Sequence, residues 1–382
     1  MTLNVLVLGA GFGGLELSSR LATELGDQVE VTLIDRSDAF VFGYAKLDVM
    51  FGKRTADEVR MPYREIAHPA VRFRQETIVA IDPATRSATT EKGTYSGDVL
   101  VVALGAGYDM AATPGLADAG HEFYSVEGAA GLRDVLAGFR GGRVVVGICG
   151  PSFKCPPAPS EASILVEEML RERGVREQSS VTLVSPFGVP VPPSPELSAA
   201  ILARFAERGI EFRNGRRVTA LDGAAREVVL DDETRIGYDL FLGIPVHRAP
   251  EVVVASGLTE NGWIPVEKGT GATRFPDVYA LGDVTSVGTP KAGVFAERAA
   301  RVLADTLIAR HRGQADPAGY DGTGACWIEI GSANVARVDV DFFSVPGKPI
   351  GVFTPPSAET FAAKESFGPE RRARWFGTPA GR

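Results

Sequence analysis

Cysteine and histidine are scarce in this chain of 382 residues, which has three cysteines and four histidines. Three scattered cysteines, at positions 149, 155 and 326, are too few for a disulfide framework. Neither they nor the histidines show metal-ligand spacing, so we expect no metal site. In a reducing compartment a disulfide is expected to be catalytic rather than structural.

Long apolar runs and a basic excess are also missing. No apolar stretch approaches the roughly 18 residues that span a bilayer. The net charge of −8 argues against nucleic acid as a partner. A first strand that starts at Leu3 leaves no room for a signal peptide, so we expect a cytoplasmic protein. The length suits two domains, or one domain with a large insertion.

The clearest motif is NVLVLGAGFGG, which reads as a buried strand followed by the pattern G-x-G-x-x-G. An amphipathic helix and a second strand, VEVTLIDR, follow and place Asp35 about 20 residues after the last glycine. Glycines let the backbone approach a pyrophosphate, and the acid accepts hydrogen bonds from ribose hydroxyls. The unit therefore predicts a dinucleotide site made by Gly9, Ala10, Gly11, Phe12, Gly13, Gly14, Asp35 and Arg36.

Two later segments, SGDVLVVALGAG (96–107) and RFPDVYALGDVTSVGTPKAGVFAE (274–297), extend this pattern. Together the three motifs resemble the FAD-binding flavoprotein superfamily with two dinucleotide domains. That resemblance implies FAD rather than NAD at the first site, with Asp283 beside the ribityl chain and pyrophosphate. The alternative for Asp283 is a helix-capping aspartate on a surface turn. The resemblance adds Ala103, Leu104, Gly105, Gly282 and Asp283 to the cofactor residues.

A second strand–helix–strand unit is expected at 143–149, 160–173 and 181–185. A further helix starts at Pro195 with Ser194 as its cap, and YDLFLGIP echoes the earlier GDVLVVALG. We therefore predict an α/β fold of two Rossmann-like domains, in which a degenerate NAD-type domain is inserted into an FAD domain. The predicted division is 1–110 and 241–312 for the FAD domain, 111–240 for the insertion and 313–382 for a small C-terminal segment.

The second unit lacks the features that bind a nicotinamide dinucleotide. In GICGPSFKCPPAPSE (147–161), the second and third glycine positions hold Cys149 and Ser152, whose side chains would crowd a pyrophosphate. The strand VTLV is followed by Ser185 and Pro186 rather than by an acid. We therefore expect that NAD(P)H is not the electron donor.

Cys155 lies in the same loop, immediately before two prolines that stiffen it. Ser160 is expected to cap the following helix. The positive end of that helix and Lys154 are expected to favour a thiolate, the form that attacks disulfides. The alternative for any of these cysteines is a small buried hydrophobe. We prefer that alternative for Cys149 and the reactive role for Cys155.

FKCPPAP, with Cys326 in GTGACWIEIG just before an expected strand, resembles the sulfide:quinone oxidoreductases and the flavin subunit of flavocytochrome c sulfide dehydrogenases. The resemblance implies that Cys155 and Cys326 form a redox pair on one face of the flavin. Its PKAG turn places Lys291 and Ala292 beside the ring, where Lys291 would stabilise the reduced form. Sulfide, or a related sulfur compound, would then reduce FAD, which passes electrons to a quinone or similar acceptor.

The chain departs from these families in two segments. GHEFYSVEGAAG (120–131) lacks the further cysteine of many sulfide:quinone oxidoreductases. DAFVFGYAKLDV (38–49) lacks the cysteine that attaches FAD in flavocytochrome c sulfide dehydrogenases, so we expect non-covalent FAD.

The C-terminal stretch SAETFAAKESFGPERRARWFG (357–377) combines aromatic residues with arginines. It offers three alternatives: peripheral contact with the anionic inner face of the cell membrane, a cap on the flavin pocket, or a homodimer contact. The packing alternatives are preferred.

Three features have two interpretations each. Glu161 is a candidate proton carrier or a simple N-terminal helix charge. His247 is a candidate base or, preferred, a surface-loop histidine. The proline-rich SPFGVPVPPSP (185–195) is a wall near the acceptor path or, by default, a rigid connector.

Rival functions are an NAD(P)H-dependent flavin reductase resembling type II NADH dehydrogenase, and a non-catalytic FAD-binding redox sensor.

Overall fold

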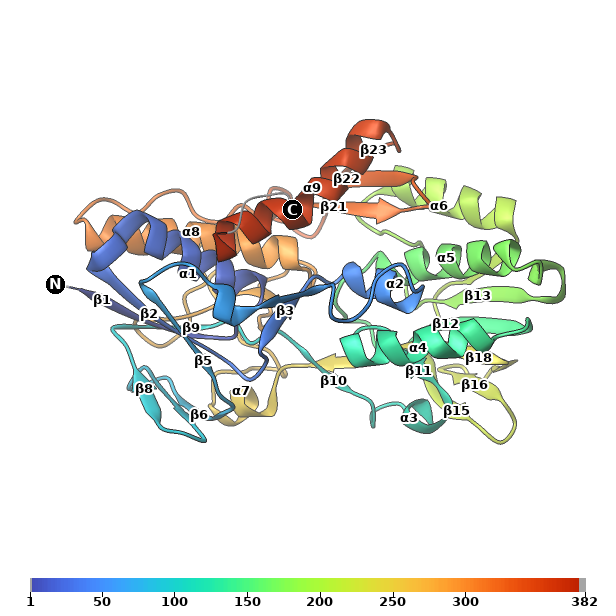
Figure 1. Cartoon of the computed structure of the whole chain (residues 1–382), viewed down its shortest axis with the longest axis horizontal. Coiled ribbons are helices and arrows are strands. Elements are labelled where there is room, and N and C mark those ends of the chain that lie inside the picture. Colours follow the sequence, from blue (N-terminus) through green and yellow to red (C-terminus); the bar gives the residue numbers. More distant parts are fainter. Residues whose placement is uncertain (1, 378–382) are drawn as a thin grey trace.

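A computed structural model describes residues 2–377, which form two five-stranded parallel sheets and five smaller antiparallel ones (Figure 1). The near-continuous apolar residues of β1 (Leu3–Leu8) are buried because elements cover both faces of its sheet. Helices α1 (Phe12–Leu25) and α8 (Gly293–His311) pack together on one face. The strand order is β20 (Val278–Ala280), β9 (Val99–Val102), β1 (Leu3–Leu8), β2 (Val29–Asp35) and β5 (Val71–Gln75).

The second parallel sheet, on the right of Figure 1, carries α4 (Val126–Gly138), α5 (Ala158–Glu172) and α6 (Pro195–Arg208). Its strand order is β11 (His121–Glu122), β18 (Leu240–Ile244), β12 (Arg143–Ile148), β13 (Ser180–Val184) and β14 (Ile210–Arg213). The prediction of two Rossmann-like domains, one inserted into the other, is confirmed.

The predicted boundary after residue 240 is wrong, because β18 pairs with β12 and so belongs to the inserted domain. The chain crosses between the domains at β10 (Gly107–Asp109) and β19 (Val246–Arg248), which pair antiparallel. The remaining short elements are β3 (Ala39–Val41), α2 (Ala45–Met50), β4 (Arg60–Pro62), β6 (Ile78–Asp82), β7 (Ser87–Thr90), β8 (Thr94–Ser96), α3 (Leu116–Ala119), β15 (Val218–Asp222), β16 (Glu227–Leu230), β17 (Arg235–Gly237) and α7 (Glu251–Ala255).

The two predicted helix caps have different outcomes. Ser194 caps α6 as expected, since its hydroxyl oxygen accepts a hydrogen bond from the backbone N–H of Leu197 at 3.4 Å. Ser160 does not cap α5, which begins two residues earlier, at Ala158, with Pro157 as its N-cap. Proline's φ is suited to the first turn of a helix, so Pro157 and Pro159 start the helix before Ser160 is reached.

The C-terminal segment forms an antiparallel sheet of β21 (Thr323–Glu329), β22 (Val335–Asp341) and β23 (Ile350–Thr354), followed by α9 (Ala358–Phe376). Figure 1 shows this sheet above the inserted domain and α9 returning over the first domain. Phe367, Trp375 and Phe376 are buried there. The indole N–H of Trp375 donates to the buried carboxylate of Glu16 in α1, at 2.6 Å.

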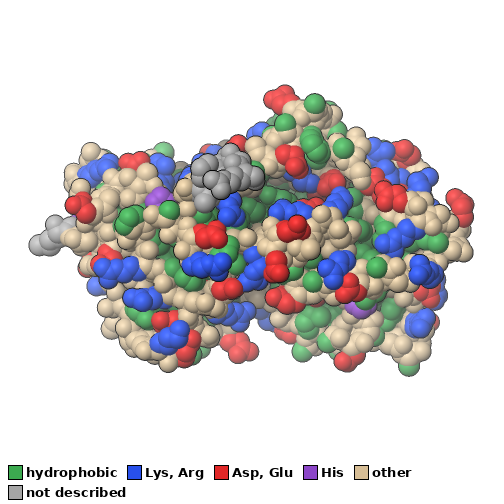
Figure 2. Space-filling view, in the orientation of Figure 1, with side chains coloured by type: hydrophobic (Ala, Val, Ile, Leu, Met, Phe, Trp, Pro, Cys, Tyr) green, Lys and Arg blue, Asp and Glu red, His purple; other side chains and the backbone are tan. Residues whose placement is uncertain are grey.

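The arginines of α9 are likewise engaged within the chain. Arg371 and Arg374 form ion pairs with Glu297 at 2.7 and 2.6 Å, and Arg372 pairs with Glu65 at 2.9 Å. These contacts place α9 against the rest of the chain, in line with the preferred packing of this stretch, whereas peripheral membrane contact and a homodimer contact stay predictions. No helix within residues 2–377 is both long and apolar enough to cross a bilayer. Figure 2 shows both signs of charge interspersed over one face.

Candidate functional site

A cavity of about 300 Å³, called here the first cavity, lies where the two domains and the C-terminal segment meet. Its walls combine the glycine-rich turn after β1, the ends of β9 and β20, the loop before α5, and side chains of β21 and α9. Of the predicted cofactor residues, those that line it are Gly11, Phe12, Gly13, Ala103, Gly105, Gly282, Asp283 and Ala292. Gly9, Ala10, Gly14, Asp35, Arg36, Leu104 and Lys291 do not line it.

The glycines of the first motif have separate tasks. A Cβ atom on Gly11 would meet no protein atom within 4 Å, so this position leaves the turn open to a ligand. A Cβ on Gly14 would lie 1.9 Å from the carbonyl oxygen of Gly9, and one on Gly9 would lie 2.4 Å from that of Ala103. Gly9 and Gly14 therefore allow the turn and the helix to pack against the strands, while Gly11 admits a pyrophosphate at the start of α1.

Two carboxylates are placed to accept hydrogen bonds from a hydroxyl-rich ligand. Asp35 is held by the backbone N–H groups of Ala10 and Ser37, both at 2.8 Å, and stays partly exposed. Asp283 lines the cavity, and within residues 2–377 its side chain has no hydrogen-bond partner. Burial raises the pKa of Asp283, an effect opposed by the charges of Lys154 and Lys291. The open turn and these two acids fit the phosphate and sugar parts of FAD.

The two predicted redox cysteines both line this cavity, although they come from distant parts of the sequence. Cys326 lies in the middle of β21, opposite Val338, rather than before a strand as expected. Cys155 has a left-handed backbone, with φ of 53°, which non-glycine residues rarely adopt. Its N–H donates to the carbonyl oxygen of Lys291 at 2.8 Å, which helps to hold that conformation. Such strain is typical of functional sites. Both cysteines are free thiols in the structure.

The prediction that the surroundings of Cys155 favour a thiolate is wrong. Burial raises the pKa of the Cys155 thiol well above its ordinary value and raises that of Cys326 to about 12, and Glu161 adds to both effects. Lys154 does not oppose this, because its ammonium donates to the carbonyl oxygen of Ala106 at 2.9 Å and lies 4.3 Å from the ring centre of Tyr108. A proton carrier is therefore needed close to the two sulfurs.

Glu161 is placed for that role. Its side chain is buried, lines the first cavity and accepts a hydrogen bond from the backbone N–H of Glu329 at 2.8 Å. Burial raises the pKa of Glu161 to about 7, against the opposing charge of Lys364. A carboxyl group with that pKa exchanges protons near neutral pH. The alternative of a solvated helix charge does not apply, because the group is not in solvent.

The lysine that the motif suggested, Lys291, does not line the first cavity. The ammonium of Lys291 donates to the carbonyl oxygen of Asp283 at 2.6 Å, lies 3.3 Å from the ring centre of Trp263 and faces a second cavity. Lys46, Lys154 and Lys364 line the first cavity instead. The sequence marked Lys154 as a neighbour of Cys155, but nothing in it showed that Lys46, in α2, would reach the site.

The second cavity, of about 540 Å³, lies on the other side of the cysteine loop and shares Pro157, Ala292 and Cys326 with the first. Phe187, Pro190, Val191, Pro192 and Pro193 line it. The proline-rich segment 185–195 is therefore a wall of this cavity, and the default interpretation as a mere connector is wrong.

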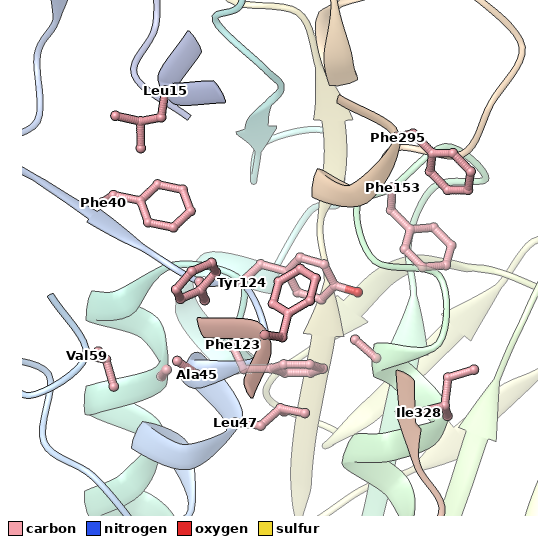
Figure 3. Packing of buried hydrophobic residues seen from close by; sticks show 14 of the residues in the cluster. Leu15, Phe40, Ala45, Leu47, Val59, Phe123, Tyr124, Phe153, Phe295 and Ile328 are labelled. Carbon is pink, nitrogen blue, oxygen red and sulfur yellow. The ribbon is translucent and has the colours of Figure 1, made fainter. Parts of the chain in front are cut away.

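Two further predictions are decided by burial. Cys149 is buried at 3% exposure in the core of the inserted domain, which confirms the preferred interpretation. His247 is buried at 4% exposure, so its interpretation as a surface histidine is wrong. Burial and the charge of Lys154 lower the pKa of His247 to about 3, so the ring stays neutral. Figure 3 shows part of a different and larger apolar cluster, to which both domains contribute side chains such as Phe40, Tyr124 and Phe153.

The inserted domain offers no cradle for a second pyrophosphate at the expected place. Residues 149–157 separate the end of β12 from the start of α5. The side chain of Cys149 is packed into the core, and Pro159 in the first turn of α5 has no N–H to donate. After β13, Ser185 is buried and accepts a hydrogen bond from the N–H of Phe187 at 3.2 Å.

Comparison with known proteins agrees with this architecture. Residues 3–301 match the family model described as pyridine nucleotide-disulphide oxidoreductase. The chain belongs to this family. Its first cavity combines the glycine-rich turn at Gly11 with Cys155 from the inserted domain and Cys326 from the C-terminal segment. Among residues 2–377, no group of His, Cys, Asp and Glu has an arrangement that could hold a metal ion.

Within this oxidoreductase family, the chain is similar to several named proteins. It is 24% identical to a mitochondrial sulfide:quinone oxidoreductase of Mus musculus, over 90% of this chain and 79% of that protein. It is also 24% identical to a type II NADH:quinone oxidoreductase of Staphylococcus haemolyticus, over 74% of each. The sulfide:quinone oxidoreductase structure from Aquifex aeolicus superposes with a TM-score of 0.86 at 20% identity, covering 100% and 93% of the two chains. The resemblance inferred from the motifs is confirmed.

Proposed function

We propose that this protein is an FAD-dependent oxidoreductase that oxidises sulfide, or a related small sulfur compound, and reduces a quinone or similar acceptor. One observation carries the proposal. Cys155 and Cys326 face the same cavity as the open turn at Gly11 and the carboxylate of Asp283. The similarity to sulfide:quinone oxidoreductases supports the choice of substrate and acceptor. When bound, FAD would take up two electrons and pass them to the acceptor.

The cavity geometry supports a sequence of roles for the two cysteines. In the oxidised enzyme they would form a disulfide, of which the free thiols are the reduced form. Cys326 lines both cavities, so a sulfur compound in the second cavity can reach its sulfur. Attack there breaks the disulfide, makes a persulfide on Cys326 and releases Cys155 as a thiolate. Glu161 would take the proton from hydrogen sulfide, and the released Cys155 sulfur stays a thiolate.

The aromatic end of the first cavity supports a flat, carbonyl-bearing acceptor. Tyr44, Trp327 and Phe367 line this end together with Lys364. The indole N–H of Trp327 is buried and has no hydrogen-bond partner within residues 2–377. An acceptor carbonyl would satisfy that donor, and the aromatic rings would contact the faces of its ring. These features suit a quinone.

The test is an anaerobic absorbance titration of the purified holoprotein, with sulfide in one sample and NADH in another. Bleaching of the flavin by sulfide is the expected result, and the next step is turnover with a soluble quinone. Bleaching by NADH alone would favour the alternative of a type II NADH dehydrogenase-like enzyme, to which the chain is also similar. Bound flavin that responds to neither donor would favour a redox sensor.

Non-covalent attachment of FAD is part of the proposal, because no cysteine occurs in 38–49 and both cavity cysteines are needed for the redox pair. Heat or acid denaturation should therefore release all of the flavin into the supernatant, whereas a covalent flavin would stay with the precipitate. A cytoplasmic location, peripheral membrane contact and a homodimer stay predictions.

Glu161 should give the reaction a characteristic pH dependence. Its pKa lies near 7, above the ordinary value of a glutamate, and the ionised form is the one that accepts a proton. We expect the rate of flavin reduction by sulfide to rise as pH increases through about 7. Stopped-flow absorbance from pH 5.5 to 8.5, roughly one and a half units on either side of this pKa, measures it.

Because sulfide itself titrates in this range, the decisive quantity is the ratio of the wild-type rate to that of Glu161→Gln at each pH. We expect this ratio to rise about tenfold to a hundredfold across the range. Glu168→Gln, on the outer side of α5, is the matched control, since its carboxylate bonds Ser332 and Arg208 away from the cavity. A constant ratio for Glu161→Gln would exclude Glu161 as the proton carrier.

A further inference from the structure

Tyr124 lies in the loop between β11 and α4 and is only 5% exposed. Its backbone N–H donates to Glu122 at 2.6 Å. Its carbonyl oxygen accepts hydrogen bonds from the ammonium of Lys46 at 2.6 Å and from the hydroxyl of Tyr108 at 2.7 Å. The edges and faces of Tyr108 and His247 enclose its ring, with ring centres 6.3 and 5.4 Å away. The position of this side chain is therefore closely determined.

The hydroxyl group of Tyr124 has no hydrogen-bond partner within residues 2–377, although it is buried. A buried hydroxyl without a partner is unfavourable and calls for an explanation. Tyr124 lines the first cavity together with Cys155 and Glu161. In Figure 3 it lies in the middle of the view, among buried side chains of both domains. Burial raises its pKa well above the ordinary value, and Cys155 is the neighbouring titratable group that contributes most to this effect.

We propose that Tyr124 is a further catalytic residue, whose hydroxyl donates a hydrogen bond to the sulfur of Cys155 when that sulfur becomes a thiolate. The proposal rests on the proposed function, in which attack on Cys326 releases Cys155. A thiolate accepts hydrogen bonds far better than a neutral thiol, which is the form in the structure. The donor would thus act on the charge that develops during the reaction and not on the resting thiol.

The charged groups around Cys155 leave a need for such a donor. Glu161 from α5 and Cys326 from β21 both disfavour a thiolate at Cys155. Lys46 from α2 favours it, but burial lowers the pKa of Lys46 itself, and its ammonium is bonded to the Tyr124 carbonyl oxygen. Lys154 precedes Cys155 in the chain, but its ammonium donates to the carbonyl oxygen of Ala106. A neutral donor stabilises a buried anion without the cost of burying a second charge.

The test uses the holoprotein with Cys149→Ser and Cys326→Ser, so that Cys155 is the one thiol left. Its rate of alkylation by iodoacetamide, followed by mass spectrometry, is proportional to the thiolate fraction. Adding Tyr124→Phe should lower this rate about tenfold at every pH below the pKa of Cys155, because the substitution should raise that pKa by about one unit. In the protein with all three cysteines, Tyr124→Phe should slow flavin reduction by sulfide by about the same factor.

Tyr238→Phe is the matched control, since it removes a buried hydroxyl that donates to Ala119 at 3.0 Å in the inserted domain. It should change neither rate. Equal alkylation rates with and without Tyr124→Phe would overturn the proposal. A clearly lower melting temperature for Tyr124→Phe would overturn its premise, because a hydroxyl without a partner contributes nothing to lose. If Tyr124→Phe slows alkylation but sulfide does not reduce the flavin of the wild-type protein, the hydrogen bond to Cys155 is supported and the proposed function is rejected.

Discussion

Cys155→Ser should retain FAD but lose flavin reduction by sulfide, with a rate at least about a thousandfold below wild type. The serine occupies nearly the same volume, so the first cavity and its glycine-rich turn are unchanged. The hydroxyl, however, cannot form a disulfide with Cys326, and an alkoxide is a far poorer leaving group than a thiolate. Stopped-flow absorbance under anaerobic conditions measures the rate, and the flavin-to-protein absorbance ratio measures cofactor content.

Two variants sharpen this comparison. Cys326→Ser should be equally slow with sulfide, because either substitution prevents the proposed disulfide. Cys149→Ser should reduce at nearly the wild-type rate, since that thiol is buried in the inserted domain and lines neither cavity. Wild-type reduction by sulfide in Cys155→Ser would mean that the cysteine pair does not carry the electrons.

Gly11→Val should fold but bind FAD at least about a thousandfold more weakly, which corresponds to about 4 kcal/mol of binding free energy. A side chain here meets no protein atom within 4 Å, and the extended backbone at Gly11, with φ of −78°, accepts a valine. The valine would instead fill the space that the turn leaves for the pyrophosphate. Flavin content after purification and fluorescence titration of the apoprotein with FAD measure the loss.

Gly14→Ala separates a ligand effect from a packing effect. Its new methyl group would lie 1.9 Å from the carbonyl oxygen of Gly9, a backbone atom that has little freedom to move. Destabilisation by about 1–3 kcal/mol is expected, despite alanine's better helix propensity, and thermal unfolding of the apoprotein measures it. If Gly11→Val melted far below wild type and Gly14→Ala did not, the roles assigned to the two glycines would be reversed.

Most of the fold could be predicted from the sequence, because its signals are local. The apolar strand, the three glycines and Asp35 lie within one short stretch, and each acts on its near neighbours. The strands β12 and β13 and the helix α6 of the second unit are predicted from the same kind of local pattern. Errors arose where assignment depends on partners distant in sequence. Residues 240–244 are mostly apolar and would suit a buried strand of either domain. Their pairing with β12 decides to which sheet they belong.

The chemical environment of the site was less predictable, since burial and charge depend on the whole fold. Lys154 adjoins Cys155 in sequence, yet its ammonium is directed to Ala106. Lys291 follows the expected motif, yet it faces the second cavity and Trp263. Nothing local showed that His247 would be buried or that the arginines of α9 would pair with Glu297 and Glu65.

Local sequence patterns are sufficient to predict the two dinucleotide-type units, the opening at Gly11, the loss of the second phosphate cradle, and the chemistry available to Cys155 and Cys326. These follow from residue types at short spacing, where sterics and backbone conformation act locally. The folded domains are needed to show that both thiols share one cavity, that Cys326 also faces a second one, and that Glu161 and Tyr124 line the first cavity with them. Proximity between distant segments, and the desolvation that shifts their pKa values, arise only when the domains and the C-terminal sheet pack together.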